Sequence, residues 1–322
     1  MSPARAIVIG LRRRDSATSP GDLVLHGVCL VASILAVLAM ALIAYEVIEG
    51  ARPAISRFGL GFIVHTTWKP NFFVFGAGSF LFGTAVTSGL ALLVATPIGI
   101  AIGLYLSLLA PKAVRGVISP LVEMIAAIPT VILGFWGILV LGPFLSRHVE
   151  PWIHAHFGFL PLFGPGQTTG SGVFNATIIL TIMIIPIVAS LSRDLFLTVP
   201  AELRDGAAAL GATRWETIRG IVLPSTASGV TAAAFLGLGR ALGEAIAVTQ
   251  VIGGGNALHA SLFQTGDTLA SRIALQFTGA ENALQTASLF YLALMLLVIG
   301  VLTNLLAQLI SGRFGQQATF AR

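Results

Sequence analysis

The stretch that decides the fold runs from Pro200 to Pro224 and reads PAELRDGAAALGATRWETIRGIVLP. Very apolar runs flank it on both sides, so it is the polar connection between two buried segments. Its opening proline and Glu202 are typical of a first helical turn, and Gly211 is typical of a helix end. Thr213 and Glu216 have the spacing of a capping box, which starts a second helix. The stretch predicts a charged helical hairpin, closed by its final proline, that projects from a membrane into water.

The composition agrees with a membrane setting. Of the 322 residues, 56% are hydrophobic and only 10% are charged, with a mean hydropathy of +0.92. Soluble domains carry about 25% charged residues, so we expect an all-α polytopic membrane protein. The single cysteine, Cys29, excludes a disulfide within the chain, and no Cys/His cluster has zinc spacing.

Six apolar runs are long enough to cross a bilayer as helices. We place them at about 23–45, 80–109, 116–145, 173–191, 225–252 and 284–310. They form one transmembrane domain over residues 23–312, with tails at 1–22 and 313–322. Pro120 and Pro129 are expected to bend or break the third span.

The Lys and Arg residues give the expected orientation. With the N-terminus inside, five of the eighteen fall outside (Arg52, Arg57, Lys69, Arg147, Arg272), Arg240 falls within a span, and the rest fall inside. This bias predicts that both termini and the hairpin are cytoplasmic. It also accounts for the net charge of +5 without nucleic-acid binding.

The hairpin resembles the cytoplasmic loop of type I ABC importer permeases, which has the form E-A-A, three residues, Gly, nine residues, Ile-x-Leu-Pro. Here the corresponding positions are 205–207, Gly211 and 221–224, so the spacing matches although Asp205-Gly206 replaces Glu-Ala. The resemblance implies a MetI-like fold with six transmembrane helices, and a loop at 200–224 that couples the permease to an ATPase. The residues it assigns to that coupling are Glu202, Asp205, Gly211, Arg214, Ile221, Leu223 and Pro224.

Arg240 is the charged residue deepest in an apolar span, where a guanidinium costs about 2.5–3.5 kcal/mol and usually faces a cavity or a partner. Glu244 follows four residues later, so the two can pair along one helix. Two interpretations stay open: a structural pair at a helix interface, or an anion pathway in which Arg240 offers a fork of donors to phosphate oxygens. The stretch 237–244 is similar to a segment of phosphate-importer permeases, which favours the pathway.

A second candidate region lies in the third span. Residues 127–137 are similar to a proline-broken segment of the same permeases, and broken helices tend to line cavities. Pro129 and Thr130 are therefore candidate pathway residues. Glu123, earlier in this span, is interpreted as half of a structural ion pair with a basic group near the cytoplasmic surface or with Arg240.

Taken together, the chain resembles the PstC-type permease subunit of phosphate-specific ABC importers. The resemblance implies phosphate translocation by alternating access in the bacterial cytoplasmic (inner) membrane. It also implies a homologous second permease (PstA-type), an ABC ATPase dimer (PstB-type) and an extracytoplasmic phosphate-binding protein (PstS-type). The alternatives are a type I permease for molybdate, sulfate or another small solute, and a passive anion channel.

The sequence has no G-x-x-x-x-G-K-[ST], H-E-x-x-H or G-x-S-x-G motif. We therefore expect a non-catalytic transporter subunit with no cofactor, whose ATP is hydrolysed by another chain.

Overall fold

The computed structural model describes residues 20–165 and 170–319, and residues 1–19, 166–169 and 320–322 lie outside the description. Within the described ranges the chain is helical and no strand is formed apart from two isolated bridges. Among the described residues, six helical runs, some built from several consecutive helices, are long and apolar enough to cross a membrane, which confirms the all-α prediction. The helices are α1 (Pro20–Phe58), α2 (Gly61–Val64), α3 (Gly78–Leu104), α4 (Lys112–Ala127), α5 (Thr130–Trp136), α6 (Gly142–Phe144), α7 (Glu150–Phe157), α8 (Val173–Leu197), α9 (Ala201–Ala209), α10 (Arg214–Thr217), α11 (Leu223–Gly243), α12 (Ile246–Val251), α13 (Leu269–Gln276) and α14 (Ala283–Thr319).

The chain divides into two units, Met1–Val47 and Ile48–Arg322. In the first unit the described residues form the N-terminal part of α1. Their large apolar side chains are exposed, as a lipid-facing helix requires. The predicted end of this span near residue 45 is wrong, because α1 continues through Pro53 to Phe58. A proline removes only one backbone hydrogen bond, and the helix formers around it carry the helix on.

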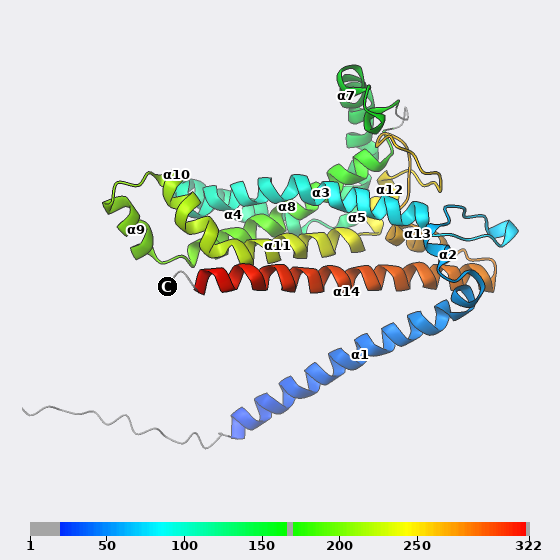
Figure 1. Ribbon diagram of the computed structural model, residues 1–322, viewed down its shortest axis with the longest axis horizontal. Helices are drawn as coiled ribbons and strands as arrows, with labels where there is room; N and C mark the ends of the chain where they lie inside the picture. Colours follow the sequence, from blue (N-terminus) through cyan, green and yellow to red (C-terminus); the bar gives the residue numbers. More distant parts are fainter. Residues whose placement is uncertain (1–19, 166–169, 320–322) are drawn as a thin grey trace, which may run out of the picture. The chain divides into compact units, whose positions relative to one another are not determined.

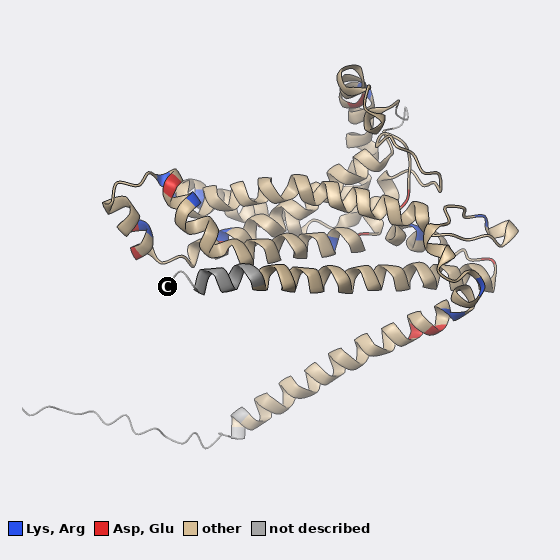
Figure 2. Ribbon diagram, in the orientation of Figure 1, with Lys and Arg blue, Asp and Glu red and all other residues tan. Residues whose placement is uncertain are grey.

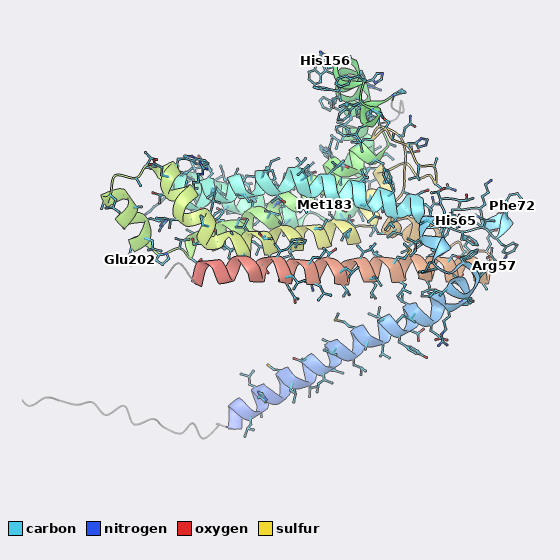
Figure 3. All side chains as sticks on the ribbon, in the orientation of Figure 1. Arg57, His65, Phe72, His156, Met183 and Glu202 are labelled. Atoms are coloured by element: carbon cyan, nitrogen blue, oxygen red, sulfur yellow. The ribbon has the colours of Figure 1, made fainter. Side chains whose placement is uncertain are left out.

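Helix α8 is the centre of the second unit. It packs against α3 on one side and α11 on another, and α14 packs against α11 (Figure 1). Ile184 and Val188 of α8 are fully buried, and Met183, labelled in Figure 3, lies within the bundle. Small residues make this close packing possible: a Cβ added at Gly99 of α3 would come within 2.8 Å of the Val188 side chain.

The third span is displaced from the predicted 116–145, because its membrane-length helix runs from Thr130 to Phe157 and α4 lies before it. The break near Pro129 occurs where the sequence predicts it. Helix α4 ends at Ala127, Ile128 and Pro129 are not helical, and α5 begins at Thr130. Pro120, in contrast, lies inside α4 without breaking it. The third span also continues past its predicted end at residue 145, because π-helical turns lead into α7, which projects from the bundle and carries His156 (Figures 1 and 3).

The hairpin forms as the sequence predicts at its tip. Gly211 has a left-handed backbone with φ of 86°, and the capping box between Thr213 and Glu216 is present. The expected closure at Pro224 does not occur, because α10, a π-helical stretch and α11 form one helical run from Arg214 to Gly243. Pro224 lies in the first turn of α11, directly after the π-helical stretch. A proline at that position loses little hydrogen bonding through its missing N–H. We call the end of the bundle that carries residues 200–224 the hairpin end.

The fifth span begins and ends earlier than predicted, at Arg214 and Gly243. Helix α11 stops at Gly243, and the short α12 follows after Glu244 and Ala245. Beyond α12, Gly253 has φ of 84° and begins the long connection that contains α13. Helix α14 then returns toward the hairpin end and continues as helix to Thr319, through most of the predicted C-terminal tail (Figure 1). The predicted N-terminal tail at 1–22 lies almost wholly outside the described residues.

Candidate functional site

A groove of about 1000 Å³ runs between α8, α11 and α14. Its walls are mainly apolar and small, with Gly229, Ala232 and Gly239 on α11 and Gly300 on α14. Of the residues that the structure describes, Arg240 is the only charged one that lines it. Figure 2 shows most charged residues toward the ends of this bundle, with α11 carrying a basic segment within it. The groove therefore combines an apolar wall with one fixed positive charge.

Arg240 is exposed on the groove side of α11, seventeen residues after Leu223, or about 25 Å along the helix. Among the described residues it forms no ion pair and no side-chain hydrogen bond. A guanidinium has five donors in a rigid fork that fits carboxylate and phosphate oxygens. The groove thus contains an unpaired guanidinium about 25 Å along α11.

The expected pair between Arg240 and Glu244 along one helix is not formed. Because α11 ends at Gly243 and Glu244 has an extended backbone (ψ 109°), the carboxylate leaves the face that carries Arg240. Its Oε1 instead accepts a hydrogen bond from the Ala247 backbone N–H at 3.2 Å. Glu244 therefore satisfies one of the free donors at the start of α12.

The breaks in spans three and five lie beside each other, because α5 packs against α12. Pro129 precedes the first turn of α5, and its carbonyl accepts from the Ile132 N–H at 2.9 Å. A Cβ added at Gly134 would lie 3.0 Å from the Cα of Ala247. Pro129, Thr130 and Glu244 thus belong to a pair of packed helix starts, and none of the three lines the groove of Arg240.

The hairpin presents both charge and apolar surface. Glu202, Asp205 and Arg214 are exposed, and Glu202 is labelled at the hairpin end in Figure 3. Leu210 is 91% exposed and Trp215 62% exposed, so the hairpin presents two large apolar side chains beside its charged ones. Neither residue is among the coupling residues predicted from the sequence, although their positions beside Gly211 and Thr213 could have indicated them.

Two of the predicted coupling residues face the bundle and not the solvent. Ile221 and Leu223 are partly buried and pack against Phe196, Val199 and Val222. They attach the hairpin to the bundle and offer little surface to a partner.

Glu123 forms the structural pair that the sequence predicted, and its partner is Arg193 of α8. The Glu123 carboxylate lies 2.9 Å from the Arg193 guanidinium, which also contacts Asp194 at 2.9 Å. The pair joins α4 to α8 near the hairpin end and does not involve Arg240.

A buried ion pair at the end opposite the hairpin was not predicted. The Arg272 guanidinium lies 2.8 Å from the Asp267 carboxylate, and both side chains are almost fully buried. Ser271 and the Thr268 N–H also donate to this carboxylate, and Arg272 lies over the Phe80 ring at 4.6 Å. Burial raises the pKa of Asp267, although the charge of Arg272 and the two hydrogen bonds oppose that rise. The loop is fixed to α3, where the Thr84 hydroxyl accepts from the Leu269 N–H at 2.9 Å.

Comparison with known proteins identifies the family. Residues 95–316 match the family described as the binding-protein-dependent transport system inner membrane component. The chain belongs to this family. The match covers the hairpin, the groove of Arg240 and both helix breaks, so every part of the candidate site lies within the shared permease region.

Individual relatives narrow the assignment within this family. It is 39% identical over 291 residues to the phosphate transport system permease protein PstC of Mesorhizobium japonicum, covering 89% of each chain. It is 40% identical to the protein of the same name from Haemophilus influenzae, covering 88% of this chain and 91% of that one. These identities and coverages place the permease in the PstC group, as the sequence resemblance implied.

Solved structures support the fold. A chain of a bacterial alginate ABC transporter, solved with a periplasmic protein bound to an alginate pentasaccharide, matches with a TM-score of 0.59 at 21% identity. That match covers 91% of this permease and 96% of that chain. A chain of the MetNI methionine ABC transporter matches with a TM-score of 0.52 at 20% identity, covering 78% and 99%. The MetI-like fold expected from the hairpin is therefore confirmed.

Proposed function

We propose that this chain is the permease subunit of an ATP-driven importer that carries inorganic phosphate across the bacterial cytoplasmic membrane by alternating access. The observation that carries the proposal is Arg240, an unpaired guanidinium in a groove between membrane-spanning helices. The names of the PstC relatives supply the substrate class, and the fork of Arg240 suits the oxygens of phosphate.

The pathway includes the two adjacent helix breaks. Broken helices expose backbone N–H and C=O groups, which is tolerated in a membrane only where protein or a watery cavity satisfies them. Pro129 and Thr130 at the start of α5, and Glu244 before α12, form such a pair. We assign them to the gate that opens as spans three and five move, while Arg240 holds the anion.

The hairpin at 200–224 transmits the motion of a separate ATPase. Its exposed charges at Glu202, Asp205 and Arg214 and its exposed Leu210 and Trp215 offer a mixed polar and apolar docking surface. The helical run from Arg214 to Gly243 joins the part of that surface that carries Arg214 and Trp215 to the position of Arg240. Motion of Arg214 and Trp215 therefore moves α11 and Arg240 with it, because they belong to one continuous helical run.

The remaining partners follow from the permease family. We assign a homologous PstA-type permease, a PstB-type ATPase dimer and a PstS-type phosphate-binding protein. The excess of Lys and Arg in the segments predicted to lie inside supports a cytoplasmic location for the hairpin and both termini. The chain itself is the non-catalytic component.

The test is uptake of radiolabelled phosphate into vesicles that hold the whole complex, comparing wild type with Arg240→Ala and Arg240→Lys. We expect ATP-dependent uptake that resists excess sulfate and molybdate, is lost in Arg240→Ala and is only partly kept in Arg240→Lys, which has charge without the fork. Uptake blocked by sulfate or molybdate would assign another oxyanion. Uptake that needs no ATP would contradict the importer.

A further inference from the structure

We infer that the polar face of α14, formed by Thr303, Asn304, Gln308 and Ser311, lines the route by which phosphate leaves Arg240 toward the hairpin end. This inference rests on the proposed function, because it names the second wall of the same pathway. It assigns an exit path to the last membrane span, which contains none of the residues proposed for the pathway above.

The spacing puts these residues on one side of the helix. Counted from Gly300, the α14 residues that line the groove lie at positions i, i+3, i+4, i+7, i+8 and i+11, ending at Ser311. Such intervals keep side chains on one face of an α-helix. The opposite face, at Leu302, Leu306 and Leu309, is apolar and exposed, as a lipid-facing surface should be.

The direction of the helices orders the face along the groove. Helix α11 runs away from the hairpin end and α14 runs back toward it (Figure 1). Arg240 is therefore the lining residue of α11 farthest from the hairpin end, and Ser311 is the lining residue of α14 nearest to it. From Asn304 to Ser311 the polar face advances by about 10 Å. It begins deep in the bundle and ends close to the hairpin.

The side chains of Asn304 and Gln308 are available to a solute. Both are exposed, and neither forms a side-chain hydrogen bond with the residues that the structure describes. Polar side chains in a membrane span are costly unless they contact a partner, water or a transported solute. An amide group has two N–H donors, so these side chains can replace part of the hydration of an anion that leaves the guanidinium.

The polar face also lacks charge, which suits an exit. A second cation there would hold phosphate as tightly as Arg240 does, and a carboxylate would repel it. Neutral donors bind phosphate more weakly, so the ion can pass from one donor to the next. Conduction requires sites that bind the ion weakly enough to release it.

The test uses the fact that the chain has one cysteine, Cys29. In a Cys29→Ser background, Asn304→Cys and Gln308→Cys are assembled into the whole complex and treated with an anionic, membrane-impermeant thiol reagent in vesicles of known orientation. Leu302→Cys and Leu306→Cys on the opposite face are the matched controls. We expect the first two to react several-fold faster than the controls, phosphate but not sulfate to slow that reaction, and modification to stop phosphate uptake.

Reaction of Asn304→Cys and Gln308→Cys at the same rate as the controls, or fast reaction that phosphate does not slow, overturns the inference. Recovery of all subunits with each variant is checked first, and Ser311→Cys replaces any variant that does not assemble. Uptake by the Cys29→Ser complex, with and without Arg240→Ala, is measured in the same vesicles. Failure of the proposed function appears there, whereas failure of the exit route appears only in the labelling pattern.

Discussion

Arg240 and Glu244 are four positions apart in the sequence, but the end of α11 separates them, and the Glu244 carboxylate accepts from Ala247 of the next helix. A span that is continuous in hydropathy is thus interrupted between its two charges. The interruption leaves Arg240 unpaired toward the groove and gives Glu244 a role at the start of α12. The two residues therefore act in different places, and variants should separate their effects.

Replacing Glu244 by Ala should destabilise the complex by about 1–3 kcal/mol, because the N–H of the fully buried Ala247 loses its partner. Glu244→Gln keeps an acceptor oxygen and should preserve thermal stability. If the gate also uses the charge, Glu244→Gln should lower ATP-dependent phosphate uptake while its melting temperature stays unchanged. Equal losses of stability in both variants would rule out the hydrogen bond as the stabilising contact.

A glycine pair on α3 tests how tightly the loop before α13 is held. A Cβ at Gly83 would overlap the Asp267 carbonyl, whereas a Cβ at Gly89 meets nothing within 4 Å. Gly83→Ala should destabilise the complex by about 1–3 kcal/mol through overpacking, and Gly89→Ala should be tolerated. The measurement is thermal unfolding of the purified complex. A Gly83→Ala variant as stable as Gly89→Ala would mean that the loop moves aside freely.

The buried pair of Asp267 and Arg272 predicts a dependence on pH. Arg272→Met leaves a buried carboxylate without its cation, which costs about 3–5 kcal/mol. Burial already raises the pKa of Asp267, and losing the opposing charge of Arg272 raises that pKa further. The folded state then holds this proton more tightly than the unfolded state, so stability falls as pH rises from the ordinary aspartate pKa through the raised one.

The control for this prediction is the double variant Asp267→Asn with Arg272→Met. It removes both charges, so it should recover much of the lost stability and show no added pH dependence, because a neutral replacement of a buried ion pair is often tolerated. Melting temperatures of the complex over a pH series give the comparison. A single variant whose stability rises with pH would contradict the sign.

Much of the fold could be predicted because its signals are local. Apolar runs located the six spans, and Gly211 with the capping box at Thr213 located the turn of the hairpin. Helix ends inside the membrane were less predictable. Pro53 and Pro120 lie within continuous helices, whereas the break at Glu244 has no proline. That break coincides with the packing of α12 against α5, which a single sequence does not reveal.

The candidate site likewise has one part that the sequence predicted and parts that it did not. Arg240 was predictable because one charge in an apolar span is conspicuous by itself. The groove was not, because its walls come from α8, α11 and α14, far apart in the sequence. The pair of Asp267 and Arg272 also escaped prediction, since a loop residue and a residue of α13 meet only once this segment has folded against α3.

The tip of the hairpin offers the sharpest test of coupling. Gly206 and Gly211 both have open space where a Cβ would be placed, but only Gly211 has a left-handed backbone, with φ of 86°. The same change to Ala should therefore strain Gly211 by about 1–2 kcal/mol and stabilise the helix at Gly206 by up to about 1 kcal/mol. Under the proposed mechanism, Gly211→Ala should leave ATP hydrolysis running while phosphate uptake falls, and Gly206→Ala should transport normally. The comparison removes side-chain size as an explanation, because both variants gain one methyl group in open space. Normal uptake by Gly211→Ala would mean that the hairpin transmits force without the turn that Gly211 fixes.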